Sequence, residues 1–195
     1  VSRWVVEHTQ TCPDNIDQLI LLATPNHGSD LTRPGLSGPT IHVKNVRVNP
    51  VRIGELAGGV AEGLNLAIRD LRPGSTVLQR LHDLPRNPAV SYAIILGDSS
   101  IVDPVLLSLS QQLLVQWQNN PIAFTVVQQL ASFEGQMDEL LSGRGDGVVS
   151  LASGRLDGVS DVTILPMRHS DVGREHKPVF QEIQREVRRR LAVSG

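Results

Sequence analysis

An aspartate and a histidine late in the chain have the residue types and the order of an acid–base pair. Asp146 lies in the segment Arg-Gly-Asp-Gly-Val-Val at positions 144–149, and His169 comes 23 positions later, after the next apolar run. An imidazole that acts as a general base needs a carboxylate on its other nitrogen, which fixes the tautomer and stabilises the imidazolium. The two glycines beside Asp146 permit a tight backbone with positive φ, which would fold this loop back under His169.

Other interpretations of the same residues stay open. The Gly-Asp-Gly segment is also typical of a plain turn, with His169 as a surface residue after a strand. Asp98, which follows another predicted strand, is an alternative carboxylate partner for the histidine. Asn26 and His27 follow the first predicted strand, and we expect them to contact a substrate. His27 would either line the substrate pocket or only shape its loop.

Continuous apolar runs predict the strands that would position these residues. Strands are expected at residues 16–23, 89–96 and 162–166, and the apolar run Leu19–Ala23 is typical of a buried parallel strand. Capping residues and apolar periodicity predict helices at 2–8, 76–82, 103–119, about 121–141 and about 175–192, with Ser75 as the cap of the second. This alternation indicates an α/β fold with a mostly parallel sheet flanked by helices. Ligands bind at the carboxyl ends of such strands, so the candidate residues would gather at one rim.

Two long segments interrupt the alternation of strands and helices. Residues 31–50 contain three prolines and two glycines, which favours an irregular excursion. Residues 51–70 have helical spacing but four glycines. Each glycine costs a helix about 1 kcal/mol relative to alanine, which favours a loosely held piece such as a lid. Three strands also make a small sheet, so we expect another segment to complete its open edge.

The composition limits the classes of function. A chain of 195 residues suits one domain, and a net charge of −2 gives no indication of binding to nucleic acid or to an anionic membrane. The single cysteine, Cys12, excludes an internal disulfide, and no run approaches the roughly 18–20 apolar residues of a membrane span. No histidine or carboxylate pair has metal-ligand spacing, so we expect no required metal and no cofactor. The first residues lack signal-peptide features and an initiator Met, so we expect an earlier biological start, and the compartment stays open.

Three motifs occur in a fixed order along the chain. Thr24-Pro-Asn-His-Gly-Ser29 follows the first strand, Gly145-Asp-Gly-Val-Val149 comes next, and His169-Ser-Asp171 follows the last strand. With the helical segment Val1–His8, they resemble the lipase and esterase branch of the α/β-hydrolase superfamily, in the part that follows the nucleophile elbow. The resemblance implies that Asp146 is the triad acid, that His169 is the base, and that the substrates are carboxylic esters of the lipid-like acyl class. It also implies one domain over 1–195, the C-terminal part of the fold, with cap- or lid-like insertions at 31–88 and 99–143.

One family motif is missing from the sequence. No serine has the G-x-S-x-G pattern of the elbow after a strand. We therefore expect the nucleophile upstream of Val1, and the N-terminal half of the same protein, or a second chain, to complete the sheet. This chain alone would then be inactive. Two alternatives remain: a hydrolase-like interaction module without catalysis, and an acyltransferase that uses the same triad.

Overall fold

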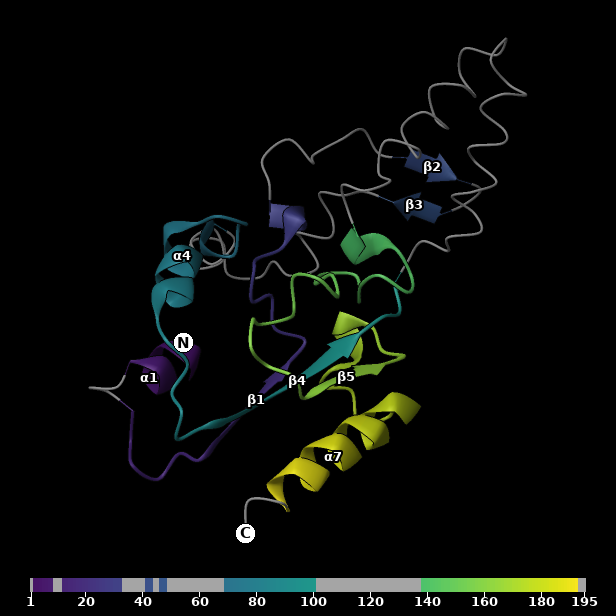
Figure 1. The fold of residues 1–195 in the computed structure, drawn as a ribbon. Coiled ribbons are helices and arrows are strands. Elements are labelled where there is room, and N and C mark those ends of the chain that lie inside the picture. Colours follow the sequence, from purple (N-terminus) through teal and green to yellow (C-terminus); the bar gives the residue numbers. More distant parts are fainter. Residues whose placement is uncertain are drawn as a thin grey trace.

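The centre of the protein is a three-stranded parallel sheet. The computed structural model describes residues 2–8, 12–32, 41–43, 46–48, 69–100 and 138–192. The sheet contains β1 (Gln18–Leu22), β4 (Ser91–Gly97) and β5 (Val162–Leu165), in the order β1-β4-β5 (Figure 1). Both strand pairs are parallel, which confirms the three predicted strands and the α/β class.

A second, smaller sheet corrects one of the sequence predictions. Strands β2 (Ile41–Val43) and β3 (Val46–Val48) pair in antiparallel fashion, inside the segment that was predicted to be irregular. The sequence did not predict this pair, because each strand has only three residues and lies in a segment with many prolines and glycines. The predicted helices at 51–70 and 103–119 lie outside the described residues, apart from the last two positions of the first.

Helices flank the parallel sheet. They are α1 (Ser2–Glu7), α4 (Thr76–Asp83) and α7 (Pro178–Leu191). The predicted cap of α4 is confirmed, because the Ser75 hydroxyl accepts a hydrogen bond from the Leu78 N–H. Short 3₁₀ turns occur at Asp30–Thr32, Asp138–Leu140 and His169–Asp171. The turn at Asp138–Leu140 replaces the described end of the helix predicted at about 121–141, and residues 121–137 are not described.

Strand β4 is the central strand, and its sequence explains why. Ala93, Ile94, Ile95 and Leu96 are each no more than 1% exposed. A strand between two parallel neighbours is covered on both faces and therefore reads as a continuous apolar run. Successive side chains point to opposite faces, so Ile95 faces one layer while Ile94 and Leu96 face the other.

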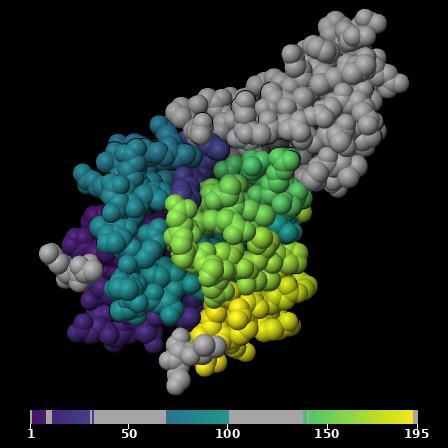
Figure 2. All heavy atoms as spheres, in the orientation of Figure 1, coloured from purple at the N-terminus to yellow at the C-terminus, as the bar shows by residue number. Residues whose placement is uncertain are grey.

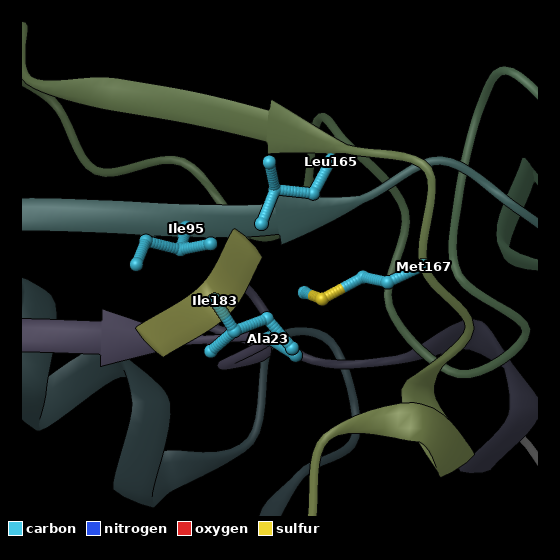
Figure 3. Close-up of a cluster of buried hydrophobic side chains, with 5 residues drawn as sticks. All are labelled: Ala23, Ile95, Leu165, Met167 and Ile183. Carbon is cyan, nitrogen blue, oxygen red and sulfur yellow. The ribbon is translucent and has the colours of Figure 1, made fainter. Parts of the chain in front are cut away.

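Helix α7 covers the first face of the sheet. Its Ile183 packs with Ala23, Ile95, Leu165 and Met167, and Figure 3 shows these five side chains gathered between the strands and the helix. Each such burial contributes about 1.5–3 kcal/mol for a large aliphatic side chain. The apolar stripe of α7 therefore holds the last strand and the last helix together.

The second face is covered by the segment that precedes β5. Leu156 packs on Leu21, Ile94 and Leu96, with partly buried side chains of the same segment around it. Figure 2 shows the result on the surface, where the purple and teal N-terminal half lies directly against the green and yellow C-terminal part. Both faces of the sheet are thus occupied by packing, and the carboxyl edge of the strands is left for the polar loops.

A buried guanidinium fixes the far end of α7. Arg190 is 3% exposed and donates to both carboxylate oxygens of Asp161, at 2.6 and 2.9 Å. It also donates to Glu186 Oε2 at 2.8 Å and to the Thr163 hydroxyl at 2.8 Å. The bonds from Arg190 hold the pKa of Asp161 below its ordinary value of 3.8. One side chain therefore joins the helix to the start of β5.

We predict that Arg190→Ala lowers the free energy of unfolding by about 2–3 kcal/mol, because several charge-assisted hydrogen bonds are lost together. The matched control is Arg189→Ala, whose exposed ion pair with Glu186 is expected to contribute less than about 1 kcal/mol. Urea denaturation measures both. The difference in unfolding free energy between Arg190→Ala and the wild type should shrink as the pH falls below 3.8. The lowered pKa of Asp161 contributes stability above this pH, and the contribution is lost as the carboxylate is protonated. Equal effects of the two variants would contradict the assignment.

Candidate active site

The loops at the carboxyl edge of the sheet bring the candidate residues together. Asn26 and His27 follow β1, Asp98 follows β4, and His169 follows β5. Asp146 lies on the loop of residues 145–150, which is closed by an isolated antiparallel bridge between its first and last residues. This edge is where open α/β sheets bind their ligands.

The Asp146 loop is held closed by its own carboxylate. Asp146 Oδ1 accepts hydrogen bonds from the N–H groups of Val148, at 2.9 Å, and Val149, at 2.8 Å. Gly147 has a φ of +99°, a conformation that side-chain-bearing residues rarely adopt. The sequence predicted such a backbone for both flanking glycines, and Gly147 has it while Gly145 does not.

The second carboxylate oxygen of Asp146 contacts the histidine. His169 Nδ1 lies 3.0 Å from Asp146 Oδ2, and the His169 main-chain N–H donates to the Asp146 carbonyl at 2.8 Å. A carboxylate can only accept, so the proton of the neutral imidazole is on Nδ1 and Nε2 carries the free lone pair. The two residues are therefore joined through both side chain and main chain.

Burial differs sharply between the two ends of this pair. The Asp146 side chain is 1% exposed, whereas the His169 side chain is 38% exposed. A buried carboxylate is tolerated only when donors replace its water shell, and this one receives three N–H groups. Nδ1 of the imidazole thus contacts a fixed acceptor, while the exposed side chain leaves Nε2 for a reacting group. This arrangement suits a general base.

Asp98, the alternative acid, has a different place in the structure. Its main-chain N–H donates to the Leu165 carbonyl at 3.2 Å, and its carbonyl accepts from the Gly143 N–H at 2.6 Å. These bonds tie the end of β4 to β5 and to the turn before the Asp146 loop. Of the two carboxylates considered from the sequence, that of Asp146 is the one hydrogen-bonded to His169.

Asn26 and His27 join the β1 loop to the segment at 150–154. Asn26 is 1% exposed and its Nδ2 donates to the Gly154 carbonyl at 2.7 Å, while the His27 N–H donates to the Ser153 carbonyl. The His27 ring stacks on His82, with ring centroids 4.5 Å apart. Burial and the neighbouring His82 hold the pKa of His27 below its ordinary value of 6.5. The predicted contact of Asn26 and His27 with a substrate stays a prediction.

Two residues that support the Asp146 loop were missed in the sequence. The Ser29 hydroxyl donates to the Val148 carbonyl at 2.7 Å, and Glu139, 1% exposed, accepts from the Asp30 N–H at 2.9 Å. Ser29 belongs to the Thr-Pro-x-x-Gly-Ser motif, which could have pointed to it. Glu139 gives no such signal, because an Asp-Glu pair near a predicted helix end is typical of a solvated surface.

In the part of the chain that the structure describes, no group of three or more His, Cys, Asp or Glu side chains could hold a metal ion. No helix among these residues is long and apolar enough to cross a membrane.

Comparison with known proteins finds a similar solved structure but no matching family. No protein-family model matches the chain, and none of the curated proteins does. Among solved structures, the chain is similar to the crystal structure of Bacillus licheniformis lipase BlEst2 in its mature form, with 18% sequence identity and a TM-score of 0.49. The match covers 93% of this chain and 60% of the lipase, so the chain spans less than two thirds of that protein.

We predict that Gly97→Ala separates Asp146 from His169. An added Cβ at Gly97 would lie 2.4 Å from the Met167 carbonyl oxygen and 2.8 Å from Asp146 Cβ, distances that require the backbone to move. Overpacking of this kind costs about 1–3 kcal/mol of unfolding free energy. Gly173→Ala is the control, because nothing lies within 4 Å of its added Cβ. Thermal unfolding and a crystal structure of the variant check the prediction, and an unshifted Asp146 loop would contradict it.

Proposed function

We propose that this chain supplies the acid and the base of a serine hydrolase that cleaves carboxylic esters, with lipid-like acyl esters as the substrate class. The observation that carries the proposal is the 3.0 Å contact between His169 Nδ1 and Asp146 Oδ2, with the acid buried and the imidazole exposed. Its place at the carboxyl edge of a parallel sheet adds support. The order of the acid and histidine motifs along the chain gives the same indication.

The chemistry follows from the tautomer that the contact imposes. His169 Nε2 takes the proton of a serine hydroxyl while the serine oxygen bonds to the ester carbonyl carbon. When the ester C–O bond breaks, the imidazolium returns that proton to the leaving alcohol. His169 then takes a proton from a water molecule, whose oxygen bonds to the carbonyl carbon of the acyl-enzyme. The carboxylic acid product leaves, and the proton returns to the serine oxygen. Asp146 Oδ2 accepts from Nδ1 and stabilises the imidazolium.

In this proposal the attacking serine comes from a segment that precedes Val1, since the chain contains no G-x-S-x-G. The place of β1 at one end of the β1-β4-β5 order supports a further strand beside it. Among the described residues β1 has one strand partner, β4, and its sequence Gln-Leu-Ile-Leu-Leu carries no charge or proline. Edge strands usually carry charged residues or prolines, which prevent pairing with other chains.

The direction of the backbone groups supports a neighbouring strand on the outer side of β1. The Ala23 N–H donates to the Ile95 carbonyl, and the Asp17 carbonyl accepts from the Ser91 N–H. Backbone groups alternate along a strand, so those of Ile20 point to the open side. We propose that a strand from the N-terminal half of the same protein, or from a second chain, pairs there. The insertions at 31–88 and 99–143 would form a cap or lid over the acyl group, and most of their residues are not described.

We predict that the full-length protein, including the upstream segment, hydrolyses p-nitrophenyl esters and that this chain alone does not. His169→Ala and Asp146→Asn should each lower kcat by about 10³- to 10⁴-fold, because the base or its orientation is lost. The matched control is Asp98→Asn, an acid-to-amide change at the same rim, with kcat expected within about threefold of the wild type. Steady-state assays over a series of acyl chain lengths measure these effects and report the preferred ester.

Several results would contradict this proposal. Activity that survives in His169→Ala excludes its role as the base, and a large loss in Asp98→Asn with none in Asp146→Asn reverses the choice of acid. Acyl transfer to an added alcohol in preference to water would favour an acyltransferase. A full-length protein without a G-x-S-x-G serine and without ester cleavage would favour an interaction module.

A further inference from the structure

A buried carboxyl next to the Asp146 loop has no part in the proposed chemistry. Glu139 is 1% exposed and lies in the 3₁₀ turn Asp138–Leu140. Its Oε1 accepts from the Asp30 N–H at 2.9 Å, while its Oε2 is buried without a hydrogen-bond partner among the described residues. Glutamate is almost never fully buried unless it is paired, so this placement needs an explanation.

Glu139 connects three separate loops of the rim. Its side chain binds Asp30, which follows β1. Its main-chain carbonyl accepts from the Ser100 hydroxyl, at 2.9 Å, and from the Gly147 N–H, at 2.7 Å. Ser100 follows β4, and Gly147 belongs to the Asp146 loop. A shift of this one residue would therefore be transmitted to all three loops.

The connection reaches Asp146 directly. Gly147 is the next residue after Asp146, and a Cβ built on Gly145 would lie 2.7 Å from Glu139 Cα, so the turn packs tightly against the loop. Ser29 adds a parallel bond from the β1 loop, through the Val148 carbonyl. The 3.0 Å contact of Asp146 with His169 thus depends on how the β1 loop and the Glu139 turn are fixed together.

We propose that Glu139 is a positioning residue, which locks the β1 loop to the Asp146 loop and so keeps Asp146 within hydrogen-bond distance of His169. The inference rests on the proposed function for its effect on ester hydrolysis. Its effect on the Asp146–His169 contact is separate and can be measured without any substrate.

The charge state of Glu139 adds a second consequence. Burial raises the pKa of Glu139 above its ordinary value of 4.5, and the nearby Asp30 and Asp138 raise it further, although the Asp30 N–H opposes the shift. Asp138 is itself paired with Arg144 at 3.2 Å, and the Asp146 carboxylate is occupied by its own donors. A raised carboxyl pKa stabilises the fold fully below 4.5, and this stability is lost as the pH rises through the raised value.

The test compares two substitutions in the full-length protein. Glu139→Gln keeps an acceptor for the Asp30 N–H and removes the titration, whereas Glu139→Met keeps similar bulk and removes the acceptor. The first readout is the proton NMR signal of the His169 Nδ1–H, assigned by its loss in His169→Ala. The second readout is kcat and KM for ester hydrolysis. Asp138→Asn is the matched control, since the side chain of Asp138 is 42% exposed.

We expect Glu139→Gln and Asp138→Asn to keep the Nδ1–H signal and the wild-type kcat. Glu139→Met should lose the signal and lower kcat by about 10- to 100-fold, with a smaller change in KM, as a small misplacement of a catalytic group does. The unfolding free energy of the wild type should fall relative to that of Glu139→Gln as the pH rises from 4.5, because only the wild type must ionise a buried group.

Three results would overturn the inference. The first is a folded Glu139→Met protein with the wild-type signal and kcat. The second is a Glu139→Gln protein as impaired as Glu139→Met. The third, which decides the case if Glu139→Met does not fold, is an identical pH dependence of stability in Glu139→Gln and the wild type. If no ester is cleaved by any of the proteins, the proposed function fails, and the Nδ1–H signal still tests the positioning role.

Discussion

The rim of this protein is organised around one buried carboxylate. Asp146 is 1% exposed at its side chain, so its charge must be compensated by donors that the fold supplies. Two of them, the N–H groups of Val148 and Val149, come from its own loop, and the third is His169 Nδ1. The need to satisfy the carboxylate therefore fixes the position and the tautomer of the imidazole. Stability and proposed chemistry depend on the same three hydrogen bonds.

The apolar sheet makes this polar arrangement rigid. Strand β4 is covered on both faces, and its last residue, Gly97, leaves just enough room for Asp146 and Met167 to approach. Met167 is fully buried in the core with Ile183 of α7, two positions before His169. The histidine is therefore anchored from the core side by packing and from the rim side by the Asp146 loop. A side chain held in this way has little orientational freedom left to lose when a reacting group arrives.

Local patterns carried most of the sequence prediction. The three strands and α4 with its Ser75 cap were predicted because each depends on residues close together in the sequence. The contact of His169 with Asp146 spans 23 positions, and its catalytic role stays a prediction. The β2–β3 pair was missed because its short strands lie among prolines and glycines. Glu139 was missed because its function comes from Asp30, 109 positions away in the sequence, and no periodicity reports such a contact. Asn26 was correctly placed at the rim, yet its buried amide holds the Gly154 carbonyl, a contact visible only in three dimensions.

In the proposed function, Asp146 and His169 activate a serine that precedes Val1. Reaction of the full-length protein with a fluorophosphonate, followed by intact-mass measurement and peptide mapping, tests it most directly. We expect a single adduct on a serine before Val1, and a labelling rate that falls by about 10³-fold or more in His169→Ala. A protein that takes no label, or one labelled equally fast with and without the imidazole, would contradict the proposed triad.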